Sequence, residues 1–306
     1  MRIVYFGTGE FAIPPLEAIA EHTVLVVTQP DRPSGRGMSL KPSPVKRAAL
    51  ELGLPVETPE KSRAPEFVEL IRALEADAMV VASYGQILSQ ALLEATQRGG
   101  INLHGSILPK YRGAAPIQRA ILEGETETGV TLMQMDKGMD TGDVIDIVRT
   151  PIGPDETYGE LQNRLASLAA DQIREWLPRI VAGDYPRQPQ DHESATIAPK
   201  VDRAESELRF DNEAAREYNR FRAFTPNPGT FLRIEGIGTV KLHQVGPSEG
   251  SAAPGTVLSV QPFPRIAFEN GSLELIEVQP EGKKRMSGRD WINGLRLRPG
   301  ENLRNG

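Results

Sequence analysis

The feature that most constrains the fold is an alternation of short apolar runs with longer amphipathic stretches, which continues from the N-terminus to about residue 180. The apolar runs are nearly continuous in Val, Ile, Leu and Ala, a composition typical of strands that are buried on both faces of a parallel sheet. The expected strands are 2–6, 24–28, 54–56, 78–82, 101–103, 130–133 and 144–148, with the last two as a hairpin, and the expected helices are 11–21, 44–52, 65–75, 88–95, 116–122 and 158–180. This alternation predicts an α/β fold, an open parallel sheet with helices on both faces.

The pattern changes after residue 183. A stretch rich in Pro, Gln, Asp and His without periodicity follows, which is typical of a linker. Beyond it we expect one helix at 213–224 and short strands at 229–234, 239–245, 255–260, 265–269 and 272–280, punctuated by Gly and Pro at the spacing of a small barrel. The sequence therefore predicts a catalytic domain at 1–184, a linker at 185–204 and a small β-barrel domain at 205–306.

Composition limits the class of protein. The chain has 306 residues, enough for two domains with separate cores. It has no Cys, which excludes a disulfide, a thiolate nucleophile and Cys-ligated zinc. The N-terminus is expected to be a strand rather than a signal peptide, and no stretch is apolar for long enough to span a bilayer. We therefore expect a cytoplasmic protein with no membrane partner.

The charge is unevenly distributed. A net charge of −6 argues against a nucleic-acid partner, yet residues 203–306 carry 15 Lys and Arg against 13 Asp and Glu. Residues 29–47 contain five Lys and Arg against Asp31 alone. The segment 30–44 within this tract is too long for an ordinary strand-to-helix connection. Two interpretations stay open: a solvated charge cluster, or an arm in which Arg36, between two glycines, approaches a phosphate backbone.

Three polar side chains are the strongest candidates for chemistry. Asn102 and His104 are two residues apart at the end of an apolar run, so on a strand they point to the same side. Asp140 lies in an Asp-Thr-Gly turn, although Asp136 and Asp143 are equally available. An amide, an imidazole and a carboxylate that converge can bind an oxyanion and move a proton. The alternatives are a structural buried histidine and a turn-forming aspartate.

Residues 7–12 match the Gly-x-Gly-x-x-Ala pattern of dinucleotide-binding folds. We favour a tight strand-to-helix turn that requires glycine, since Asp31, the acid that would bind a ribose, falls inside a loop. An NAD-dependent oxidoreductase remains an alternative on this pattern. The basic tract 282–287 is either a solvated loop or a phosphate contact.

Several strings resemble the methionyl-tRNA formyltransferase family. They are 28–37 with 42–46, 102–109 with 112–118, 129–136 running into 140–143, 222–226, and 282–287. Together they span nearly the whole chain. Folate formyltransferases that act on a small amine share the Asn-His-Asp set but not the strings at 28–46 and in the second domain. The sequence departs from the family at a few positions. Ile107 stands where the family often has Leu, and Gly9 stands where Pro is common. The pair Met38 and Ser39 falls where the family often has Lys or other polar residues.

The resemblance implies a Rossmann-like domain that binds 10-formyltetrahydrofolate and an OB-like barrel that contacts tRNA, in a monomer without a metal. It implies Asn102, His104 and Asp140 as catalytic residues. The implied donor-binding residues are Ser106, Ile107, Leu108, Pro109, Val81, Tyr84, Gly85 and Ile87. The implied tRNA-binding residues are Arg36, Lys41, Lys46, Lys283 and Lys284.

We therefore expect an enzyme that transfers the formyl group of 10-formyltetrahydrofolate to the amino group of initiator methionyl-tRNA, giving N-formylmethionyl-tRNA for translation initiation. A folate-dependent formyltransferase or deformylase acting on a small molecule remains an alternative. A non-catalytic RNA-binding module is a third hypothesis, of a different class.

Overall fold

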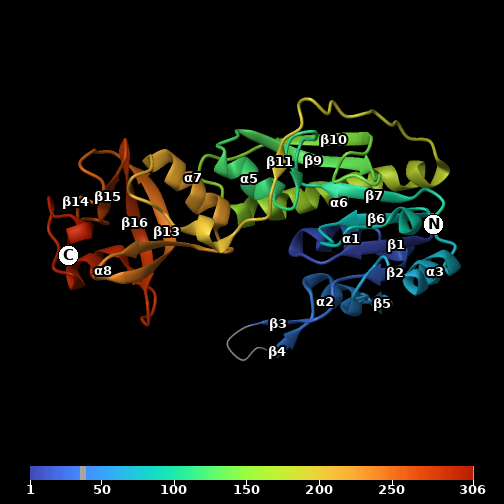
Figure 1. Ribbon diagram of the computed structural model, residues 1–306, viewed down its shortest axis with the longest axis horizontal. Coiled ribbons are helices and arrows are strands. Elements are labelled where there is room, and N and C mark those ends of the chain that lie inside the picture. The colour runs from blue at the N-terminus through green and yellow to red at the C-terminus, as the bar shows by residue number, and fades with distance from the viewer. Residues whose placement is uncertain (35–38, 306) are drawn as a thin grey trace. The chain divides into compact units, whose positions relative to one another are not determined.

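The computed structural model describes residues 1–34 and 39–305, which form two compact units (Figure 1). The first unit comprises Met1–Pro116, Glu127–Pro151 and Gln162–Pro199. The second comprises Ile117–Thr126, Ile152–Leu161 and Lys200–Gly306. Each unit therefore contains segments that are far apart in the sequence.

The first unit is built on a seven-stranded sheet in the order β10-β9-β7-β6-β1-β2-β5. Its strands are β1 (Ile3–Gly7), β2 (Thr23–Val27), β5 (Val56–Glu57), β6 (Ala78–Ala82), β7 (Gly100–His104), β9 (Glu127–Gln134) and β10 (Val144–Pro151). The first five run parallel, whereas β9 is antiparallel to β7 and forms the expected hairpin with β10. The predicted α/β fold class is confirmed.

Both faces of this sheet are covered, which explains why its central strands are apolar throughout. Phe67 and Ile71 of α3 (Pro65–Ala73) and Leu92 of α4 (Gln90–Leu93) pack on one face. On the other face, the Tyr5 hydroxyl donates to the Ala12 carbonyl at 2.6 Å. A Cβ on Gly7 would lie 2.8 Å from the side chains of Tyr5 and Ala12. Close packing therefore accounts for this glycine of the Gly-x-Gly-x-x-Ala pattern.

The helices follow the sequence pattern with local differences. The other helices of the first unit are α1 (Ile13–Ala18), α2 (Pro44–Glu51) and most of α6 (Tyr158–Ala182), with 3-10 turns η1 (Glu10–Ala12) and η2 (Ala20–His22). The expected helix at 11–21 is divided into η1, α1 and η2, and the one at 88–95 shortens to α4, which Ser89 caps. An unexpected hairpin pairs β3 (Arg32–Ser34) with β4 (Ser39–Lys41). Within the described residues, no helix is long and apolar enough to cross a membrane.

The second unit is an antiparallel sheet packed against helices, with a core of its own. The sheet order is β12-β13-β16-β15-β14, and β17 pairs with β16. The elements are η3 (Arg203–Ser206), α7 (Ala214–Phe224), β12 (Thr230–Ile234), β13 (Gly238–Ser248), β14 (Val257–Ser259), β15 (Arg265–Phe268), β16 (Gly271–Pro280), β17 (Met286–Ser287), α8 (Gly288–Gly294) and η4 (Leu303–Asn305), and α5 (Pro116–Leu122) also belongs largely here. Neither β17 nor α8 was expected from the sequence.

The stretch after α6 has little regular structure, but much of it lies against the first unit. Gln188 pairs with Val144 of β10, and β11 (Ile197–Ala198) pairs with β8 (Arg112–Gly113). Figure 1 shows this chain, in yellow, running back from the end of α6 to β11. Residues 186–198 are therefore in position to contact the loops that follow the sheet strands.

Candidate active site

Strand β7 brings Asn102 and His104 to one side of the sheet near its carboxyl end. Asn102 lies opposite Val81 of β6 and Met133 of β9, so the strand has a neighbour on each side. Both polar side chains are buried, with 8% and 5% of their surfaces exposed. In open α/β sheets, the carboxyl ends of the strands are where ligands bind.

Asp140 meets these two side chains, although it lies in the loop between β9 and β10. Asn102 Nδ2 donates to Asp140 Oδ1 at 3.4 Å, and His104 Nδ1 lies 3.6 Å from Asp140 Oδ2. The Gly113 backbone N–H donates to the same Oδ2 at 2.8 Å. The structure therefore brings together all three residues that the sequence singled out for chemistry.

The partners of His104 restrict where its protons lie. Its Nε2 is 2.9 Å from the Tyr111 carbonyl oxygen, which can only accept a hydrogen bond, so Nε2 carries a proton. Its Nδ1 faces the Asp140 carboxylate. An imidazole and a carboxylate that face each other can act together as an acid–base pair.

The Asp140 loop is held in a tight conformation. Asp140 has a φ of 54°, in the left-handed region that Asp tolerates better than most residues. A Cβ on Gly142 would lie 1.9 Å from the Gln134 carbonyl oxygen, so the loop requires glycine there. Asp136 accepts hydrogen bonds from Gly138 N and Thr141 Oγ1, while Asp143 pairs with Arg187. Of the three carboxylates left open by the sequence, Asp140 is the one that faces His104.

The expected donor-binding string 106–109 forms the turn after β7. Ser106 is buried and its hydroxyl donates to the Lys110 carbonyl at 2.7 Å. Thr131 Oγ1 donates to the Ser106 carbonyl at 2.6 Å and accepts from Leu108 N at 3.1 Å. Leu108 is buried, and Ile107 and Pro109 are partly exposed. Thr131 therefore holds the backbone of this turn.

The second expected donor-binding group lies at the end of β6 and in the turn that follows it. Val81 and Tyr84 are buried, and the Tyr84 ring meets the Phe6 ring edge-on at 5.1 Å. Gly85 has a positive φ of 84°, and Ile87 is 88% exposed. Met139, in the Asp140 loop, is 58% exposed. Val81 and Tyr84 are thus part of the packed core next to the site, while Ile87 and Met139 present apolar surface to solvent.

Burial raises the pKa of Tyr84 to about 12, a shift that the neighbouring Ser62 hydroxyl opposes. Neither hydroxyl has a hydrogen-bond partner of good geometry in the described part of the chain. Tyr84 is thus a buried polar group that is only weakly satisfied.

The expected tRNA-binding residues lie in different surroundings. Arg36 lies outside the described residues. Lys41 is exposed on β4, and Lys283 and Lys284 are exposed in the turn between β16 and β17. Lys46 is already paired, since its Nζ lies 2.8 and 2.9 Å from the two carboxylate oxygens of Asp31.

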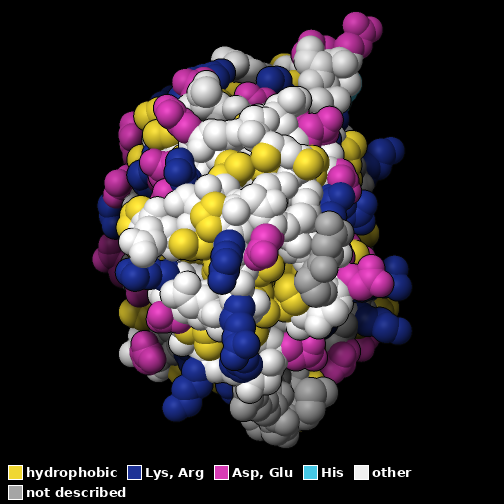
Figure 2. Space-filling view, turned by 90° about the vertical axis from the view of Figure 1, so that its left-hand side faces the viewer, with side chains coloured by type: hydrophobic (Ala, Val, Ile, Leu, Met, Phe, Trp, Pro, Cys, Tyr) yellow, Lys and Arg dark blue, Asp and Glu magenta, His cyan; other side chains and the backbone are white. Residues whose placement is uncertain are grey.

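The second unit also contains a cationic cleft that was not predicted from the sequence. Its volume is about 660 Å³, and its lining includes Arg203, Phe231, Arg233, Lys241, His243 and Arg285. Thr230 also lines it, and this buried hydroxyl has no hydrogen-bond partner among the described residues. Figure 2 looks onto the second unit and shows Lys and Arg among apolar and acidic side chains. The signal in the sequence was a basic residue between two apolar ones in each strand, Arg233 in β12 and Lys241 in β13.

Comparison with known proteins identifies the family. Residues 1–180 match the family described as formyl transferase, and residues 200–296 match the formyl transferase C-terminal domain. The methionyl-tRNA formyltransferase of Sorangium cellulosum is 47% identical over 98% of both chains. The chain belongs to the methionyl-tRNA formyltransferase family. It is therefore an enzyme, a one-carbon transferase, and the resemblance noted in the sequence is confirmed.

Other relatives agree with this assignment. The methionyl-tRNA formyltransferase of Myxococcus xanthus is 46% identical and covers 98% of this chain and 96% of the relative. Among solved structures, an N-formyltransferase from Helicobacter canadensis in complex with folinic acid and dTDP-3-aminofucose has a TM-score of 0.66 at 19% identity, covering 90% of this chain and 98% of that one. HypX from Aquifex aeolicus in complex with tetrahydrofolic acid has a TM-score of 0.64 at 17% identity, covering 95% and 47%. The solved structures support the fold alone.

Proposed function

We propose that this formyl transferase moves the formyl group of 10-formyltetrahydrofolate to the amino group of initiator methionyl-tRNA, giving N-formylmethionyl-tRNA in the cytoplasm. The observation that carries the proposal is the meeting of Asn102, His104 and Asp140 beside the end of β7. The names of relatives 42–47% identical to this chain support the same substrate.

Asn102 has a donor available for the oxyanion. When the amine attacks, the formyl carbonyl oxygen takes on negative charge. An amide nitrogen carries two N–H groups, and Asn102 Nδ2 uses one of them on Asp140 at 3.4 Å. The second is available for the oxyanion, and such a donor contributes about 2.7–4 kcal/mol of transition-state stabilisation in comparable enzymes.

The His104–Asp140 pair manages the proton. The attacking nitrogen forms a bond to the formyl carbon and loses a proton, while the nitrogen that leaves must gain one. The pair lies beside Asn102, and its imidazole and carboxylate are groups that can accept the first proton and supply the second. The Tyr111 carbonyl keeps the imidazole in the orientation that this requires.

The residues around these three side chains fit a flat, partly apolar formyl donor. The donor supplies the electrophilic carbonyl carbon of the reaction. Ile87 and Met139 offer exposed apolar surface, the backbone of 106–109 is fixed by Thr131, and Gly85 leaves its turn without a side chain. The buried side chains of Val81 and Tyr84 contribute to donor binding by packing rather than by direct polar contact.

We propose that tRNA contacts are made by both units of a monomer. In the first unit they are Arg36 and Lys41, with Lys46 contributing less because Asp31 already neutralises it. In the second unit they are Lys283, Lys284 and the cationic cleft. Basic side chains around a cleft are suited to hold phosphates without reading sequence.

A formyl-transfer assay tests the proposal by comparing charged initiator tRNA with free methionine at equal concentration. We expect transfer to the tRNA at a kcat/KM at least about a hundredfold higher, since the basic groups supply binding energy that free methionine cannot use. His104→Ala serves as the control for chemistry at this site. Equal kcat/KM values for the two acceptors would favour the small-molecule alternative.

A further inference from the structure

Gln190 is a buried glutamine in a stretch that has almost no regular structure. Its surface is 7% exposed. Nε2 donates to the carbonyl oxygens of Asp140 at 2.9 Å and Gly142 at 2.7 Å. Oε1 accepts from Arg112 Nε at 3.1 Å and from Arg112 Nη2 at 2.7 Å. Both N–H groups and both lone pairs of the carboxamide are therefore used.

Arg112 determines which way this carboxamide points. A guanidinium only donates, so the oxygen of Gln190 must face Arg112 and the nitrogen must face the two carbonyls. Arg112 is itself buried, and its Nη2 also lies 3.0 Å from His192 Nδ1. In the part of the chain that the structure describes, no carboxylate lies at ion-pair distance from Arg112. The buried charge is instead held by hydrogen bonds, which are stronger for a charged donor than for a neutral one.

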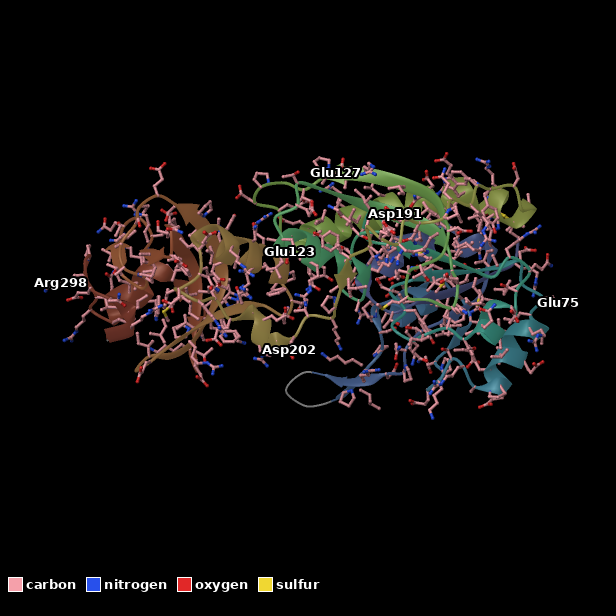
Figure 3. The ribbon with its side chains drawn as sticks, turned by 45° about the horizontal axis from the view of Figure 1, so that its top comes forward. Glu75, Glu123, Glu127, Asp191, Asp202 and Arg298 are labelled. Atoms are coloured by element: carbon pink, nitrogen blue, oxygen red, sulfur yellow. The ribbon has the colours of Figure 1, made fainter. Side chains whose placement is uncertain are left out.

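The two carbonyls that Gln190 binds belong to Asp140 itself and to Gly142, two residues further along the same loop. Asp140 has its φ at 54°, a conformation that persists where surrounding contacts over-determine it. Gly113, next to Arg112 on β8, donates to the Asp140 carboxylate itself. Figure 3 labels Asp191, the next residue along the chain from Gln190, on the strip that crosses the first unit. Gln190, Arg112 and Gly113 thus hold the backbone and the carboxylate of one residue.

We propose that Gln190, oriented by Arg112, is a positioning residue for formyl transfer: it fixes the Asp140 loop so that the carboxylate stays 3.6 Å from His104. The inference rests on the role proposed above for Asp140. It assigns part of the catalytic geometry to a residue about fifty positions downstream of Asp140, beyond α6.

The kinetic test uses two variants and a matched control in the full-length chain. The hydrogen bonds of the Gln190 carboxamide to Arg112, Asp140 and Gly142 are called the clamp below. Gln190→Ala removes the whole clamp, and Gln190→Glu keeps the size and the contact with Arg112 but removes both N–H donors. We expect each to lower kcat by about ten- to a hundredfold with KM values for both substrates unchanged, as a small displacement of a reacting group does. The control is Gln188→Ala, which removes an exposed glutamine two residues before Gln190. Only the backbone of Gln188 pairs with Val144, so this change should leave kcat unchanged.

A double-mutant cycle separates positioning from general stability. If Gln190 acts through Asp140, adding Gln190→Ala to Asp140→Ala should leave the residual kcat unchanged. A merely structural role would lower the residual kcat of Asp140→Ala further, and that result would overturn the inference.

Hydrogen exchange decides the inference without any substrate, so its failure is distinguishable from failure of the proposed function. The Gly113 N–H donates to Asp140 Oδ2, whereas the adjacent Ala114 N–H donates to the Ala198 carbonyl at 2.9 Å. Gln190→Ala should make the Gly113 amide exchange about tenfold faster or more while the Ala114 amide stays protected. Unchanged protection of Gly113 would refute the clamp even if the enzyme formylates tRNA. Selective loss of protection would support the clamp even if tRNA proved to be the wrong acceptor.

Discussion

Asn102 and Asp140 contact each other across the site, and His104 lies beside them. We predict that Asn102→Ala and Asp140→Ala each lower kcat by at least about a hundredfold with little change in KM, because they act mainly in the transition state. Steady-state kinetics in which each substrate is varied while the other is saturating gives kcat and both KM values. Asp143→Ala is the control, since Asp143 is in the same loop but pairs with Arg187. Near-normal kcat in either variant means that its role is misassigned.

The first unit contains two buried tyrosines, Tyr5 and Tyr84, whose hydroxyl groups differ in their hydrogen bonding. Tyr5 donates to Ala12 at 2.6 Å, while the Tyr84 hydroxyl lacks a good partner among the described residues. We predict that Tyr5→Phe costs about 1–2 kcal/mol in the free energy of unfolding and that Tyr84→Phe is neutral or slightly stabilising. Urea denaturation of the ligand-free enzyme measures both. A Tyr84→Phe variant destabilised as much as Tyr5→Phe would show that Ser62 or a water satisfies the hydroxyl.

At the scale of elements, one lysine lies in the hairpin β3–β4 and another near the start of α2, and the two differ in whether they already form an ion pair. Lys41 is exposed, whereas Lys46 is paired with Asp31. We predict that Lys41→Ala weakens tRNA binding and reduces the slope of log K against log salt by about 1, as the loss of one phosphate contact does. Lys46→Ala should change the slope less. Binding titrations at several salt concentrations give the slopes, and equal slopes for Lys41→Ala and the unchanged enzyme would remove Lys41 from the tRNA surface.

The sequence predicts those strands and helices whose burial is visible in the pattern of apolar residues within the segment itself. The buried strands of the first sheet are found close to where their apolar runs place them, because a strand covered on both faces needs a continuous apolar run. The helix expected at 11–21 breaks after Ala18, and α8 was not expected because it is short and polar. The hairpin β3–β4 lies in a tract of Pro, Ser and Lys that carries no strand pattern.

The site is predictable where its residues carry distinctive chemistry. Asn102 and His104 share a face because they are two apart on one strand, and this follows from the period of a strand. Asp140 was one of three equal carboxylates, and only the fold of its loop separates it from Asp136 and Asp143. The contact between Gln190 and this loop joins residues 50 apart, and a lone glutamine in a polar stretch gives no signal of burial.

At the scale of the whole molecule, the second unit includes segments that lie between elements of the first unit in the sequence. Tyr218 of α7 donates to Asp155 at 2.7 Å, and Arg222 donates to the carbonyls of Gly153 and Glu156. Gly159 N also donates to the Thr225 carbonyl at 3.1 Å. We predict that a chain ending at residue 199 loses these contacts and unfolds at a lower Tm, measured by circular dichroism. An unchanged Tm would mean that the segment 152–161 is stable without α7.

Because truncation is expected to disturb both units, charge reversal is the sharper test of the second unit's role. Arg233 lines the cationic cleft, and Arg298 is an exposed arginine of the same unit that is not among the residues lining it. Both Arg233→Glu and Arg298→Glu change the net charge by the same amount. We predict that Arg233→Glu raises KM for methionyl-tRNA by about tenfold, with kcat and the KM of the formyl donor unchanged, while Arg298→Glu has less than half of that effect on log KM. Similar increases in both variants would show that net charge alone governs tRNA binding, and that the cleft is not a docking site.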